Sequence, residues 1–162
     1  HGNLDVLQRC GAIIRTGSGT DNVPVSDATE RGIVVANTPE AISEPVAEHA
    51  IALWLSVIRQ IPIQDRAVRR GVWDRDLAMP RYHIKSHTLG VIGFGHIARA
   101  VVRKVRGFEL RVLVADPFVD ESIMKELGAE KAALDTVLSE AEFVTVHTPL
   151  MESPHHLIGA RG

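Results

Sequence analysis

The stretch "TLGVIGFGHIARA", Thr88–Ala100, places two glycines one residue apart between an apolar run and a segment with helical spacing. "TLGVI" predicts a short buried strand, and Ile97 and Val101 begin an apolar helix stripe. Gly93 permits backbone angles that other residues avoid, and Gly95 has no Cβ to keep a ligand away from the backbone. The stretch therefore predicts a strand, a tight glycine turn and a helix whose N-terminus can hold a phosphate.

A carboxylate follows this turn at the distance that a dinucleotide site requires. Asp116 closes the predicted strand "LRVLVAD" and stands 21 residues after Gly95 (116 − 95). An acid at that place accepts hydrogen bonds from the adenosine ribose hydroxyls. It also repels a 2′-phosphate, and no arginine follows it in "ADPFVD", so NAD is favoured over NADP. Ala98 supplies the small third residue of the fingerprint; the glycines alone would fit a plain strand-to-helix turn equally well.

Strands and helices are predicted to alternate along the whole chain, which indicates a doubly wound α/β fold with a parallel sheet. Ser43 is the expected N-cap of the longest helix, and Pro62 is expected to break it. A second amphipathic piece follows up to Gly71, and a loop covers 72–87. The predicted strands are 11–15, 33–37, 88–92, 110–116 and 142–150, and the predicted helices are 26–32, 43–61, 97–108, 120–127 and 134–141.

Composition excludes several classes of function. The formal net charge is −2 over 162 residues, with no basic field for nucleic acid or for an anionic membrane. The longest apolar block, 50–58, is too short to span a bilayer. Cys10 is the single cysteine, which excludes an internal disulfide and fits a reducing, cytoplasmic setting.

Several blocks of the chain resemble one known family. They are, in chain order, "RTGSGTDNV", "ERGIVVANTPE", "VAEHAIALWL", "TLGVIGFGHIA", "VADPF", "VTVHTPL" and "HHLIG". The resemblance is to the D-isomer-specific 2-hydroxyacid dehydrogenases, most closely the branch with phosphoglycerate dehydrogenase and the C-terminal-binding protein corepressors. It implies a flavodoxin-like substrate domain ending near residue 40 and an incomplete Rossmann-type NAD domain over 41–162. The helix after Ser43 would be the interdomain helix and the interface of a homodimer.

The resemblance also implies site residues for NAD and for a small 2-hydroxy or 2-keto acid. The glycine turn at 17–19 would bind the substrate carboxylate through Ser18 and Gly19, and Ser18 would touch NAD; without the family, "TGSGT" fits a plain turn. The backbone amides of His96 and Ile97 would meet the pyrophosphate. The remaining cofactor residues would be Gly93, Phe94, Gly95, Asp116, and Thr148 and Pro149 as a wall beside the adenosine.

No catalytic residue is assigned. Hydride transfer from a hydroxy acid needs a base for the hydroxyl proton and a cation for the carboxylate. The family supplies an Arg, a Glu and a His, all beyond the match to "HHLIG", so we expect a fragment that binds NAD without turnover. The segment "ARG", 160–162, superficially resembles the family's arginine block, but it follows "LIG" directly, without the intervening helix and strand, so Arg161 is not taken as the catalytic arginine.

The histidines do not complete a site either. His49 follows Glu48, but adjacent helix residues point about 100° apart. The pair at 155 and 156 lacks a third metal ligand, and His147, at a strand end near the cofactor, reads as structural. Two rival functions stay open: an NAD(H)-binding regulatory protein of the corepressor kind, and a nucleotide-binding fold without chemistry.

Overall fold

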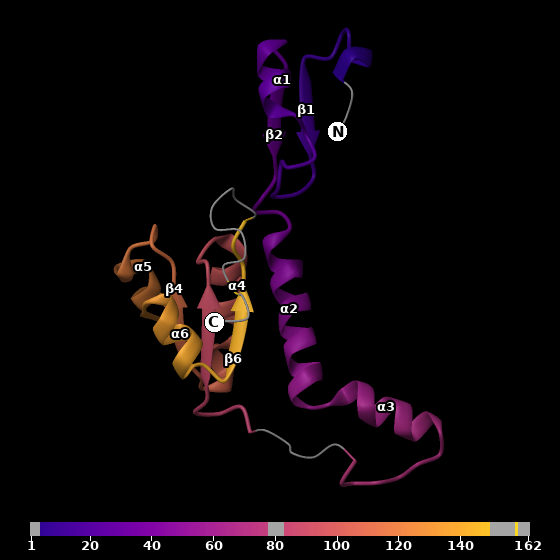
Figure 1. Ribbon diagram of the computed structural model, residues 1–162, viewed down its shortest axis with the longest axis vertical. Coiled ribbons are helices and arrows are strands. Elements are labelled where there is room, and N and C mark those ends of the chain that lie inside the picture. The colour runs from indigo at the N-terminus through magenta and orange to yellow at the C-terminus, as the bar shows by residue number, and fades with distance from the viewer. Residues whose placement is uncertain (1–3, 78–82, 150–157, 159–162) are drawn as a thin grey trace. The chain divides into compact units, whose positions relative to one another are not determined.

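The computed structural model describes residues 4–77, 83–149 and 158. Its contacts divide the chain into two compact units, His1–Pro45 (unit 1) and Val46–Gly162 (unit 2), which are described separately (Figure 1). The division falls in the first turn of helix α2 (Ser43–Ile58), a few residues after the boundary expected near residue 40.

Unit 1 is a small strand–helix–strand unit. Strands β1 (Ala12–Arg15) and β2 (Val34–Asn37) pair in parallel, and helix α1 (Val25–Glu30) connects them. A short 3-10 helix, η1 (Leu4–Val6), precedes β1. The buried core consists of Leu4 from η1, Ala28 from α1 and Ile33, which directly precedes β2.

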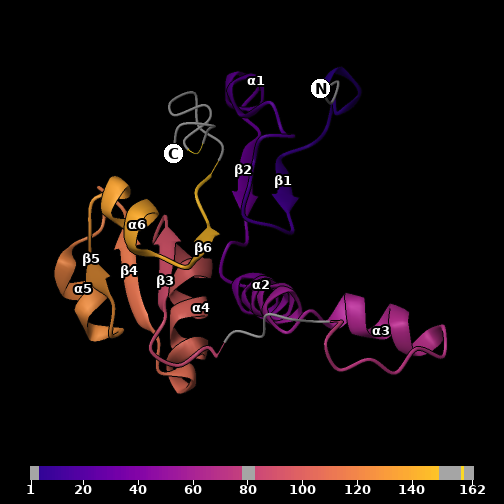
Figure 2. The ribbon, with the colours of Figure 1, turned by 60° about the horizontal axis from the view of Figure 1, so that its bottom comes forward.

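Unit 2 is built on a parallel sheet with strand order β5-β4-β3-β6 (Figure 2). The strands are β3 (Thr88–Ile92), β4 (Arg111–Ala115), β5 (Glu130–Lys131) and β6 (Phe143–Val146). Every residue of β3 is buried, as expected for the central strand of a sheet that is covered on both faces. The predicted parallel α/β fold is confirmed.

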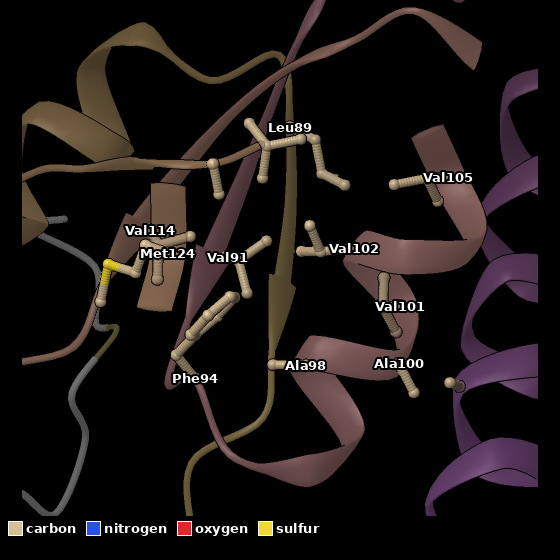
Figure 3. Packing of buried hydrophobic residues seen from close by; sticks show 13 residues of the cluster. Leu89, Val91, Phe94, Ala98, Ala100, Val101, Val102, Val105, Val114 and Met124 are labelled. Carbon is tan, nitrogen blue, oxygen red and sulfur yellow. The ribbon is translucent and has the colours of Figure 1, made fainter. Parts of the chain in front are cut away.

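Alternate residues of β3 and β4 point to opposite faces of the sheet, so each face has its own core. Val91 and Val114 pack with α4 (His96–Val105) and with Met124 of α5 (Glu121–Glu126). Figure 3 shows Val91 and Phe94 between Met124 and the side chains of α4. On the other face, Ile92 and Leu113 pack against Val137 of α6 (Leu134–Glu140).

Helix α2 ends at Ile58, and α3 (Ile61–Arg69) follows it. Gln60 adopts a left-handed conformation with φ 52°, and Pro62 lies in the first turn of α3. The break therefore comes slightly before the proline, which starts the second helix rather than ending the first. α2 packs on α4 through Ala47, and Trp54 makes T-shaped contacts with Phe108 and Phe143.

Three details differ from the sequence-based expectations. Ser43 is the first residue of α2 rather than a residue before it, and its Oγ donates a 2.8 Å hydrogen bond to the carbonyl of Pro39. The 97–108 helix closes with a 3-10 turn, η2 (Arg106–Phe108). Strand β5 was not expected, because two charged residues form no apolar pattern and their pairing with β4 is a tertiary contact.

Candidate dinucleotide-binding site

The glycine turn after β3 needs glycine at its first position. Gly93 has φ +81°, and its N–H donates a 2.9 Å hydrogen bond to the carbonyl of Ala115 at the end of β4. A Cβ here would lie 2.9 Å from Thr148 Cγ2 and 3.0 Å from the backbone of His147. Both the left-handed backbone and the close approach of the chain after β6 therefore exclude a side chain.

The second glycine has the opposite surroundings. Gly95 is the N-cap of α4, with extended backbone angles, and a Cβ built on it meets nothing within 4 Å. The first helical bond runs from the N–H of Arg99 to the carbonyl of Gly95, 3.1 Å. The N–H groups of His96, Ile97 and Ala98 precede that bond, so the helix itself offers them no partner. Open space in front of these amides suits an anion.

Asp116 joins the glycine turn to the loop that follows β4. Its Oδ2 accepts a 2.7 Å hydrogen bond from the N–H of Phe94, and its Oδ1 accepts a 2.8 Å bond from the N–H of Phe118. The carboxylate is therefore fixed beside the turn, at the carboxyl end of β4. Each oxygen keeps a further lone pair for a ribose hydroxyl.

These residues border one cavity of about 620 Å³. Six of the predicted cofactor residues lie on it: Gly93, Phe94, Gly95, Asp116, Thr148 and Pro149. Phe94 is fully buried in the core, and its N–H is bonded to Asp116 beside the cavity. His96 and Ile97 are not among the lining residues; they form the first turn of α4, directly after Gly95.

Thr148 and Pro149 approach the cavity from β6, on the side of β3 opposite to β4 and Asp116. Thr148 stands against Gly93, since its Cγ2 is one of the atoms that a Cβ at Gly93 would meet. The two predicted wall residues therefore flank the glycine turn.

The cavity also includes residues that were not predicted to bind the cofactor. His147 borders it, and its Nε2 lies 2.9 Å from Thr145 Oγ1. Burial lowers the pKa of His147, which favours the neutral imidazole. Phe118, Lys131 and the apolar run 132–134 complete the lining on the β4–β5 side. Phe118 follows "ADP" directly, so its place after the strand-end acid was a usable indication.

Ser18 and Gly19 belong to unit 1, in the turn after β1. Asn37, at the end of β2, donates a 2.7 Å hydrogen bond from Nδ2 to the carbonyl of Ser18. The N–H of Thr38 donates to the carbonyl of Gly17, 3.2 Å. The turn is thus attached to the carboxyl end of the neighbouring strand, and both Ser18 and Gly19 are exposed.

No acid–base pair forms between Glu48 and His49. The Glu48 carboxylate instead accepts a 2.8 Å bond from Lys104 Nζ on α4, and His49 is exposed. In the described parts of the chain, no three His, Cys, Asp or Glu side chains gather as a metal site would require. The histidines at 155 and 156 and Arg161 lie outside the described residues. None of the helices described here is long and apolar enough to cross a membrane.

Residues 51–162 match the family model of the D-isomer specific 2-hydroxyacid dehydrogenase, NAD binding domain. This chain belongs to that family. A glyoxylate reductase of Korarchaeum cryptofilum is 41% identical over 144 residues, which cover 87% of this chain and 43% of the relative. A D-3-phosphoglycerate dehydrogenase of Archaeoglobus fulgidus is 39% identical over 157 residues, covering 97% and 28%.

Solved structures agree with this membership. The structure of a D-lactate dehydrogenase from Aquifex aeolicus, complexed with NAD and lactic acid, matches with a TM-score of 0.84 at 28% identity. The match covers 95% of this chain and 46% of that one. The chain therefore spans less than half the length of these relatives. Within the 2-hydroxyacid dehydrogenase family, the cavity of unit 2 lies in the NAD-binding domain, and NAD is the cofactor that its residues fit.

Proposed function

We propose that the full-length protein is an NAD-dependent oxidoreductase that acts reversibly on the CH–OH group of a D-2-hydroxy acid. The observation that carries the proposal is the convergence of the glycine turn, the N-terminus of α4 and Asp116 on one cavity. The names of the relatives, glyoxylate reductase and D-3-phosphoglycerate dehydrogenase, favour an enzyme over a corepressor-like regulator. Bound NAD supplies the hydride chemistry, and the protein supplies binding and orientation.

Residues of unit 2 hold the cofactor in this proposal. The N–H groups of His96 and Ile97 bind the pyrophosphate through the space that Gly95 leaves open. Asp116 accepts the ribose hydroxyls and disfavours a 2′-phosphate by charge repulsion. Thr148 and Pro149 close the cavity beside the turn. The neutral imidazole of His147 carries no positive charge that would attract the phosphates away from these N–H groups.

Residues of unit 1 serve the substrate. The turn around Ser18 and Gly19 binds the carboxylate of the acid through its backbone amides, and Ser18 also reaches the cofactor. Unit 1 is then the last part of a substrate domain, and residues from about 41 onward form the NAD domain. We assign no catalytic residue to these 162 residues, so the chain by itself binds NADH without turnover.

The proposed activity is tested by the full-length protein in an NADH oxidation assay with glyoxylate, pyruvate and hydroxypyruvate. We expect NADH-dependent reduction of at least one acid and none by the 162-residue chain. Absence of reduction by the full-length protein, together with retained NADH binding, would support the regulatory alternative. Reduction by the 162-residue chain would show that it contains the catalytic groups.

The cofactor preference is tested on the chain itself by titrating NADH and NADPH and following the nicotinamide fluorescence. Asp116→Asn removes the charge and keeps one carbonyl oxygen, which can accept only one of the two loop N–H groups that the carboxylate accepts. We expect NADH affinity to fall about tenfold, at about 1.4 kcal/mol, and the ratio of NADPH to NADH affinity to rise. Equal loss for both cofactors would indicate a structural effect only, and no loss would contradict the role of Asp116.

The proposal includes a homodimer through α2. Beside the face that packs on α4, this helix carries a second apolar stripe, Val46, Leu53 and Val57, and all three are exposed. Burial of such a stripe is favourable by about 25 cal/mol per Å² of apolar surface. Val57→Glu is expected to shift sedimentation from dimer to monomer, whereas Ala52→Glu, on another exposed face of α2, should leave it unchanged. A monomeric wild-type chain would contradict this interface.

A further inference from the structure

Phe94, between the two glycines of the turn, has both of its backbone groups bonded to charged side chains. Its N–H donates to Asp116 Oδ2 at 2.7 Å, and its carbonyl accepts a 3.0 Å hydrogen bond from Nε of Arg99 in the first turn of α4. The guanidinium of Arg99 also lies over the Phe94 ring, with Cζ 5.7 Å from the ring centre. Because Phe94 is fully buried in the core (Figure 3), Arg99 is anchored on a rigid group.

The charge of Arg99 has no explanation in the stability of α4. The first turn of a helix lies at the positive end of the helix dipole, so a cation there is slightly unfavourable. The bonds of Arg99 lead instead into the glycine turn. Its Nε donates to the carbonyl of Phe94, and its backbone N–H donates to the carbonyl of Gly95 at 3.1 Å. Arg99 therefore holds two successive carbonyl groups, one on either side of Gly95.

The bonds to these carbonyls also fix the directions of two N–H groups. In a planar trans peptide, the C=O group and the N–H group that follows it point in opposite directions. The N–H groups of Gly95 and His96 therefore both point away from Arg99. Gly95 borders the cavity, whereas Arg99 is not among the residues that line it. Successive N–H groups that point the same way suit an anion.

The peptide group between Phe94 and Gly95 depends on the Arg99 side chain for its orientation. Glycine permits a wide range of backbone angles. A Cβ on Gly95 would meet nothing within 4 Å, so no packing restricts this residue. Among the described residues, Arg99 Nε is the one donor to the carbonyl of this peptide. Loss of that donor would leave the peptide free to rotate.

We infer that Arg99 is a positioning residue for the cofactor: its side chain fixes the peptide before Gly95, so that the N–H of Gly95 becomes a further donor to the pyrophosphate. The inference rests on the proposed function, because it requires the phosphates of NAD to lie in front of α4. The rival account is that the guanidinium attracts the phosphates directly through its charge. The two accounts differ in whether the donor or the charge of Arg99 matters.

Two substitutions of Arg99 separate these accounts in NADH titrations of the 162-residue chain. Arg99→Gln keeps a nitrogen donor at the position of Nε and removes the charge, whereas Arg99→Met removes both. We expect Arg99→Gln to bind NADH within about twofold of wild type, and Arg99→Met to bind it about fivefold more weakly at low and at high salt. Arg103→Met removes a charge from the next turn of the same helix and should change nothing. Equal losses in the two Arg99 variants would mean that the charge matters, and would overturn the inference.

A spectroscopic measurement follows the amide of Gly95 itself. In the amide proton–nitrogen correlation spectrum, NADH should move the Gly95 proton resonance of wild type downfield, because a charge-assisted hydrogen bond forms. Arg99→Gln should keep this movement and Arg99→Met should lose it. Changes spread over all the amides of α4 would mean that Arg99 only supports the helix, and would overturn the inference.

The same spectra distinguish a failure of this inference from a failure of the proposed function. A wild type that binds NADH without moving the Gly95 resonance would overturn the role of Arg99 and leave the cofactor site standing. A wild type that binds no NADH would refute the proposed cofactor site, and this inference with it.

Discussion

Each of the two units has a glycine turn after its first strand, and the two turns differ in what requires the glycines. In unit 2, Gly93 has φ +81°, and an added Cβ would meet the backbone of His147. In unit 1, Gly17 and Gly19 have no positive φ, and an added Cβ would meet the side-chain ends of Arg15 and Asp21. Flexible side chains can move away at little cost, whereas a packed backbone cannot.

Two glycine turns that look alike in the sequence can therefore have different physical reasons for their glycines. The fold of unit 2 demands glycine at 93 and leaves 95 free for a ligand. Within unit 1 the fold demands little from Gly17 or Gly19, so the reason for a glycine-rich turn there lies outside the unit. A ligand that approaches the backbone is such a reason, and this supports the proposed substrate role.

The largest expected effect is that of Gly93→Ala. The left-handed backbone and the clash with the chain after β6 together should lower the free energy of unfolding of unit 2 by about 2–4 kcal/mol. Urea unfolding followed by the fluorescence of Trp54 measures this, since Trp54 packs on Phe108 in the unit 2 core. Gly107→Ala is the control, because a Cβ there meets nothing within 4 Å. Equal stability of both variants would contradict the account of Gly93.

Gly95→Ala should separate binding from stability. A methyl group at this position enters the open space in front of α4, where the pyrophosphate is proposed to lie. NADH affinity should fall about tenfold or more, while the free energy of unfolding changes by about 0.5 kcal/mol, as expected for an N-cap glycine. Unchanged NADH affinity would place the phosphates elsewhere.

The stability of unit 2 should depend on pH through His147. Its pKa in the fold lies below the ordinary value of 6.5, so between these two values the unfolded chain binds more protons than the folded one. The free energy of unfolding should therefore decline as the pH falls from 6.5 towards the lowered pKa. In His147→Gln this free energy should change less with pH. Identical slopes for the two proteins would exclude this histidine as the cause.

The smallest effect on folding is expected for Gly17→Ala. Only the end of the Arg15 side chain has to move, so hydrogen exchange of the β1 and β2 amides should report a change below about 0.5 kcal/mol. In the full-length protein, the proposed substrate role of this turn predicts that the same substitution raises KM for the acid and leaves KM for NADH unchanged. A large loss of protection in β1 would mean that the two turns are alike after all.

The parts of the fold and site that could be predicted are those that follow from local pattern. β-branched strands, the glycine turn and Asp116 all have fixed spacings, and they lie together at the cavity as those spacings require. Strand β5 and the bond from Lys131 to the carbonyl of Val119 could not be predicted, because both depend on the pairing of β5 with β4. The break at Gln60 was expected at Pro62, since a left-handed glutamine leaves no mark in the sequence.

Asp116 has a consequence for the evolution of cofactor choice. The carboxylate that would distinguish NAD from NADP also accepts the amides of Phe94 and Phe118 and so connects two loops. A substitution that removes the acid to admit a 2′-phosphate also removes these connections. A change of cofactor preference at this position is therefore coupled to stability, and a lineage that makes it needs compensating substitutions in the 93–95 turn or the 117–119 loop.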